Sequence, residues 1–223
     1  MSFYIYSPDW FSGIDSILEI ISIIISFLIA YYSYKTYKFF NLKKYKYFAV
    51  AFILIGLSFI SKIISNLIFI VPKKREITFS FYQLIYTYYS QLDYIEDISF
   101  FIHKFSLLIS LLILYLIIMN EKKMQNILMF ISYTLIISFL ITNYLLFNFV
   151  IVIITMFLFF INHIKDKKKK KNSSLSLFFL GFSISYFFIF LALENTIFYF
   201  LGEMILLITF INLLFNLIKT FKK

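Results

Sequence analysis

Long apolar stretches separated by short polar gaps follow one another along this chain. Seven such stretches lie near 14–34, 47–70, 97–119, 126–143, 146–162, 175–193 and 197–217. Each is close to the ~20 apolar residues that a helix needs to cross the hydrocarbon core of a bilayer. The pattern predicts an all-α fold, a polytopic membrane bundle of seven transmembrane helices that forms a single domain over residues 1–223.

Basic residues gather in every second gap between these stretches. The first, third and fifth gaps and the C-terminal tail hold most of the 21 Lys and Arg residues. The N-terminus and the fourth and sixth gaps hold none, and the second gap balances its three basic residues with four acids. Because short basic loops stay on the cytoplasmic side, we expect a multi-pass protein of the cell membrane with its N-terminus outside and its C-terminus inside.

The gap over 72–98 is the one gap long enough to hold structure of its own. Its apolar residues recur at helical spacing: Ile77, Phe81, Leu84, Ile85, Tyr88, Leu92 and Ile95. The spacing predicts an extra interfacial helical segment here, or a long outer extension of the third span. Its many tyrosines suit the headgroup layer, where a ring with one polar end is stable.

Small and polar side chains recur on single faces of the first and third spans. They are Ser12, Asp15, Glu19, Ser22 and Ser26 in the first span, and Ser99, His103, Ser106 and Ser110 in the third. Spacings of three and four residues place each set on one helix face. Such faces pack inward in membrane bundles, because the lipid-facing surface can be uniformly apolar.

Ionisable side chains inside the spans are the candidate functional residues. Each costs at least a few kcal/mol at membrane depth unless it is paired, hydrated or functional. We expect an outward-facing polar pocket formed by Glu19, Lys62, Asn66, His103, Lys104 and Glu203. Such a pocket suits a small polar or zwitterionic solute, or a proton relay. The alternative is a pair of structural ion bridges, in which Glu19 and Glu203 each take one lysine and close the bundle without a ligand.

The fifth gap contains five consecutive lysines, Lys167, Lys168, Lys169, Lys170 and Lys171. A juxtamembrane lysine contributes roughly 1 kcal/mol to attraction toward anionic headgroups. Anionic lipid at the cytoplasmic face is therefore a candidate partner, although the run also serves simply to fix topology. The net charge of +10 lies largely in such loops, so no nucleic-acid partner is expected.

No motif in the chain specifies a reaction. The two histidines, His103 and His163, lie toward opposite ends of their spans, and the chain has no cysteine, so we expect no metal and no cofactor. The segment Gly181-Phe182-Ser183-Ile184 has the local pattern of an intramembrane serine protease, but Ser183 lies near mid-membrane, far from His103. We expect no catalytic residues and no enzymatic activity.

Two non-enzymatic functions remain. The first is a receptor, sensor or membrane-complex subunit that contacts another membrane protein. The alternative is a small-solute transporter built as a 3+1+3 helix repeat, suggested by the similar segments Gly56-Leu57-Ser58 and Gly181-Phe182-Ser183. Neither proline lies within a span, and proline-free helices favour the first function, because carriers of that type move about helix breaks.

Overall fold

The computed structural model describes residues 14–70, 82–119, 133, 136–137, 140–141, 143–168, 174–192 and 197–221. These residues form six long helices: α1 (Ile14–Phe40), α2 (Lys43–Ile70), α3 (Tyr82–Met119), α5 (Tyr144–Lys168), α6 (Ser174–Leu191) and α7 (Ile197–Phe221). All six are long and apolar enough to cross a membrane. The described part of the chain is therefore a membrane helix bundle.

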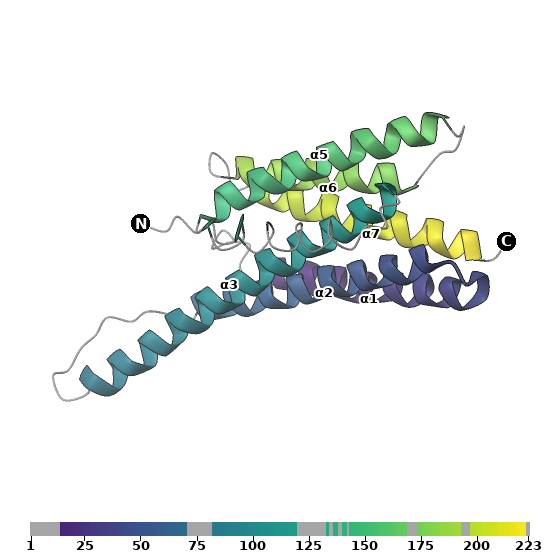
Figure 1. The fold of residues 1–223 in the computed structure, drawn as a ribbon. Coiled ribbons are helices and arrows are strands. Elements are labelled where there is room, and N and C mark those ends of the chain that lie inside the picture. The colour runs from purple at the N-terminus through teal and green to yellow at the C-terminus, as the bar shows by residue number, and fades with distance from the viewer. Residues whose placement is uncertain are drawn as a thin grey trace.

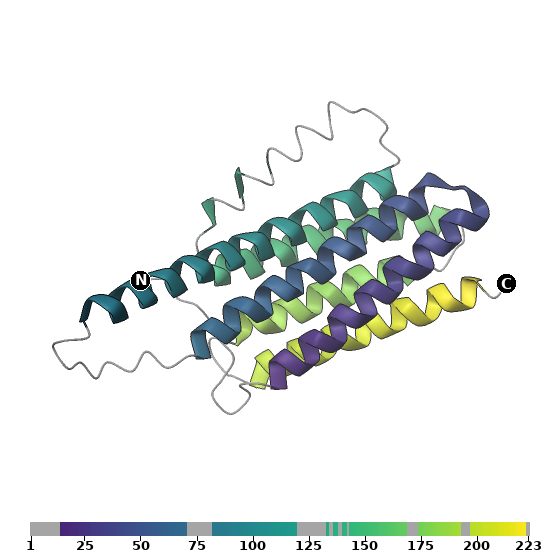
Figure 2. The ribbon, with the colours of Figure 1, turned by 90° about the horizontal axis from the view of Figure 1, so that it is seen from below.

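The six helices form a closed ring. Within each half of the chain, neighbours in sequence are neighbours in space, so α1 packs on α2, α2 on α3, α5 on α6 and α6 on α7. Contacts of α3 with α5 and of α1 with α7 close the ring. The first three helices thus face the last three (Figures 1 and 2).

Helices α3 and α5 run in the same direction. The C-terminal end of α3 and the N-terminal end of α5 lie at opposite ends of the bundle (Figure 1). The span predicted over 126–143 falls between these two ends of the chain and lies mostly outside the described residues, so the count of seven stays a prediction.

Helix α3 is longer than a membrane crossing requires. Its 38 residues correspond to about 57 Å of helix, and its N-terminal part projects beyond the other helices (Figure 1). No glycine or proline interrupts the sequence between Tyr82 and Met119. The described part of the 72–98 gap is therefore an extension of the third span. The prediction of a separate interfacial segment is wrong for residues 82–98. Residues 72–81 lie outside the described chain.

Lysines mark one end of the bundle, which we call the basic end. The turn between α1 and α2 lies there, with Asn41 at a positive φ of 52° that asparagine tolerates. Described lysines at the ends of four helices share this location: Lys35, Lys38, Lys43, Lys44, Lys46, Lys165, Lys167 and Lys219. The described lysines of the first gap, the fifth gap and the C-terminal tail therefore lie together at one end of the bundle.

Phenylalanine rings fill the middle of the ring of helices. Five buried side chains form what we call the aromatic layer: Phe52 and Phe59 on α2, Phe178 and Phe182 on α6, and Phe210 on α7. The Phe210 ring centroid lies 5.5 to 6.2 Å from the centroids of the other four. These rings join the two halves of the bundle across its centre.

Candidate functional site

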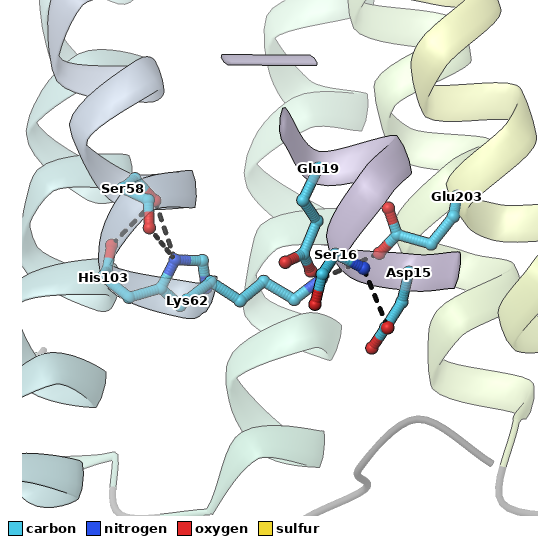
Figure 3. A network of polar contacts seen from close by, with 7 residues as sticks. All are labelled: Asp15, Ser16, Glu19, Ser58, Lys62, His103 and Glu203. Carbon is cyan, nitrogen blue, oxygen red and sulfur yellow. Dashed lines mark hydrogen bonds and ion pairs between the residues drawn. The ribbon is translucent and has the colours of Figure 1, made fainter. Parts of the chain in front are cut away.

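Three charged side chains from three helices meet near the end of the bundle opposite the basic end. The Lys62 ammonium on α2 lies 2.7 Å from Glu19 Oε1 on α1 and 2.7 Å from Glu203 Oε1 on α7. Their exposed fractions are 6, 0 and 1 % respectively. Figure 3 shows both carboxyl groups directed at the lysine. We call Glu19, Lys62 and Glu203 the charge cluster.

Local sequence explains how the two acids reach this position. The inward face predicted for α1 is confirmed for its four described members, Asp15, Glu19, Ser22 and Ser26, which are all buried, whereas Ser12 lies outside the described residues. On α7, Gly202 precedes Glu203 and lies against α6, where an added Cβ would come within 2.9 Å of the Ser185 carbonyl oxygen. A residue without a side chain therefore lets α7 approach α6 closely beside the charge cluster.

A second polar contact joins α2 to α3 one turn from Lys62. His103 Nδ1 lies 3.0 Å from the Ser58 carbonyl oxygen and 2.8 Å from Ser58 Oγ. Because a carbonyl oxygen only accepts, Nδ1 carries a hydrogen and donates it, while the Ser58 hydroxyl donates to the His103 carbonyl oxygen at 3.1 Å. Nε2 has no hydrogen-bond partner among the described residues.

Lys104 does not join the charge cluster. Its ammonium donates to the Ile141 carbonyl oxygen at 2.5 Å and lies 4.3 Å from the centroid of the Phe100 ring. It therefore links α3 to the segment just before α5. The expected pairing of each acid with its own lysine is replaced by an arrangement in which Lys62 contacts both acids.

The other predicted site residues lie apart from these contacts. Asn66 is one turn beyond Lys62 on α2 and partly buried, and its amide nitrogen has no hydrogen-bond partner among the described residues. In the lysine run, Lys167 and Lys168 end α5, whereas Lys169, Lys170 and Lys171 lie outside the described chain. The predictions that Asn66 binds a ligand and that the lysine run binds lipid headgroups stay predictions.

Three buried tyrosines around Lys62 were missed in the sequence. The ammonium lies 5.6 Å from the centroid of the Tyr199 ring, and Tyr144 and Tyr186 also interact with it electrostatically. Tyr199 lies four residues before Glu203, so both face the same side of α7. That spacing was a usable signal, but the high aromatic content of the chain, 23 %, obscured it.

A separate polar group lies near the basic end, between α5 and α6. Asn162 Nδ2 donates to Ser176 Oγ at 2.7 Å and to Asp166 Oδ2 at 2.9 Å. The Ser176 hydroxyl donates to Asp166 Oδ2 at 2.7 Å. We call Asn162, Asp166 and Ser176 the amide cluster. Among the described residues, no three His, Asp or Glu side chains lie close enough together to hold a metal ion.

Comparison with known proteins adds no name to this site. The chain matches no protein family, no curated protein and no solved structure. The function must therefore be argued from the geometry of the bundle itself.

Proposed function

We propose that this multi-pass membrane protein is a non-enzymatic receptor, sensor or membrane-complex subunit of the cell membrane, with its N-terminus outside and the basic end in the cytoplasm. Short basic segments are retained on the cytoplasmic side, which supports this orientation. Another membrane protein and anionic lipid at the lysine-rich face are its proposed partners. The charge cluster then lies in the outer half of the bilayer.

The observation that carries this proposal is the separation of the polar groups. The aromatic layer lies between the charge cluster and the amide cluster, and all five of its rings are buried. Hydroxyl groups at middle depth bind backbone carbonyls, as Thr155 binds Ile151 and Thr209 binds Ile205. A carrier needs a polar route that continues from one side to the other, so this arrangement favours a static bundle.

The alternative function, a small-solute transporter with a 3+1+3 repeat, has support from helix order. Exchanging α1, α2 and α3 for α5, α6 and α7 in that order leaves the list of neighbouring helix pairs unchanged. The similar segments do not make equivalent contacts, however. Ser58 binds α3, whereas Ser183 donates to Val152 on α5, the counterpart of α1. The side-chain contacts therefore favour the receptor or subunit function.

Cysteine accessibility distinguishes the two functions, because the chain has no native cysteine. Ser183→Cys places a thiol at the aromatic layer, and Ile184→Cys places its matched control on the lipid-facing side of the same helix. In intact membranes, a static bundle gives both thiols the same low reactivity toward a small water-soluble reagent. A carrier that alternates its access gives Ser183→Cys a clearly higher rate, which would overturn the proposal.

The orientation is tested with two exposed positions. Tyr94→Cys lies on the projecting part of α3, and Lys44→Cys lies at the basic end, and both native side chains are exposed. An impermeant reagent added outside intact cells is expected to label Tyr94→Cys and to label Lys44→Cys only after the cells are opened. The reverse result would invert the proposed topology.

A further inference from the structure

The charge cluster contains one more acid than base. Both Glu19 Oε1 and Glu203 Oε1 contact the same ammonium at 2.7 Å, so these two oxygens lie within twice that distance of each other. With all three groups ionised, the cluster would carry one net negative charge. Burying an uncompensated carboxylate in the apolar interior of a membrane bundle is costly.

The second oxygen of each acid is also unsatisfied. Glu19 Oε2 and Glu203 Oε2 are buried and have no hydrogen-bond partner among the described residues. Both carboxyl groups point into the cluster (Figure 3). The site therefore offers acceptor atoms and negative charge in excess, and it lacks a donor for either second oxygen.

Neighbouring cations do not supply the missing charge. The Lys104 ammonium donates its hydrogen bond to the Ile141 carbonyl oxygen. The acidic group with which this ammonium interacts is Asp97. His103 directs Nδ1 at the Ser58 carbonyl oxygen, and its Nε2 has no hydrogen-bond partner among the described residues, so neither nitrogen contacts the two acids. On α2 and α3, Lys62 is therefore the cation that the two acids share.

The remaining titratable neighbours do not remove the excess either. Asp15 lies one turn from Glu19 in the first turn of α1, and its Oδ1 accepts a hydrogen bond from the Ser16 backbone nitrogen at 2.8 Å, where a helix N-terminus stabilises a carboxylate. Tyr144, Tyr186 and Tyr199, on α5, α6 and α7, are phenols that bring no charge of their own.

We propose that the charge cluster is a proton-binding site, in which Glu19 and Glu203 together hold one proton and Lys62 remains an ammonium. The proton comes from water at the nearby end of the bundle. A hydronium ion transfers it to a carboxylate oxygen, one O–H bond forms, and a water molecule is released. The cluster is then neutral, and the new hydroxyl supplies the donor that the site lacks.

A proton suits this site better than a larger cation. The described residues offer no group of three acidic or histidine ligands for a metal ion, and an organic cation would need space among side chains that are almost fully buried. Two carboxylates held close together commonly share a proton, because both cannot easily ionise. The inference goes beyond the proposed function and holds for a receptor, a subunit or a carrier alike.

Infrared spectroscopy of the full-length protein in lipid vesicles at neutral pH tests the proposal. The wild-type protein should show the C=O stretching band of a protonated carboxylic acid. Glu19→Gln and Glu203→Gln each leave one carboxylate for one lysine, so the band should fall to background in both. Asp15→Asn removes a neighbouring acid outside the cluster and should leave the band unchanged.

The outcomes separate clearly. If the wild-type spectrum lacks the C=O band of a protonated carboxylic acid, the proposal is overturned without any variant being measured. A band that persists in both Gln variants, or that disappears in Asp15→Asn, places the proton elsewhere and also overturns it. If one Gln variant fails to fold, as judged by its helical circular dichroism, the other variant decides the assignment.

Discussion

The charge cluster and the amide cluster tie the bundle together in different ways. Lys62 and Glu203 are 141 residues apart in sequence, whereas Asn162 and Ser176 are only 14 apart. The charge cluster therefore fastens the first helices of the chain to the last, while the amide cluster fastens two consecutive helices. Ionic contacts therefore close this ring, and neutral donors reinforce a local hairpin.

Removal of the central cation, Lys62, should destabilise the bundle more than any other single change proposed here. Lys62→Met leaves two buried acids without a countercharge, so we expect a loss of about 3 kcal/mol in the free energy of unfolding. Thermal unfolding in detergent measures it. Lys104→Met is the matched control, because that lysine is also within a span but contacts a carbonyl oxygen and the Phe100 ring in place of two buried acids, so its loss should be smaller, about 1 to 2 kcal/mol. Equal losses in the two variants would contradict the central role of Lys62.

A second change acts on the packing that positions Glu203. Gly202→Ala adds a Cβ that comes within 2.9 Å of the Ser185 carbonyl oxygen, a backbone atom that cannot move aside. We expect α7 to move away from α6 and the free energy of unfolding to fall by about 2 kcal/mol, as in other overpacked interiors. Gly56→Ala is the control, since its Cβ meets only the Phe27 ring at 3.2 Å. A smaller melting-temperature change for Gly202→Ala than for Gly56→Ala would refute this explanation.

Periodicity in the sequence was sufficient to predict which helix faces point inward. In α1 and α3 the polar stripe is buried as expected, including Glu19 and His103. The reason is physical, because a helix in lipid has no other place for a row of polar side chains. The same periodicity predicted a helix in the outer segment but left open whether it is separate or continuous with α3, although no glycine or proline interrupts residues 82–119.

Sequence alone was insufficient to assign partners between helices. Lys62 and Lys104 lie at similar predicted depths, and depth does not say which helices are adjacent in the ring. Lys104 lies beside the segment before α5, so it binds Ile141 and not an acid. Tyr199 was readable only once Glu203 was known to face inward. Hydropathy gives spans and faces, and neighbour order must come from three-dimensional packing.

The smallest effect tests whether the two clusters are independent. Ser176→Ala removes the hydroxyl that donates to Asp166 and accepts from Asn162. We expect the free energy of unfolding to fall by about 1 kcal/mol. Combined with Lys62→Met, the two losses should add to within about 0.5 kcal/mol, because the aromatic layer separates the sites and they share no partner. Unfolding of the double variant in detergent measures the sum. A clearly non-additive result would mean that the layer transmits changes from one end to the other, and it would favour the carrier over the static bundle.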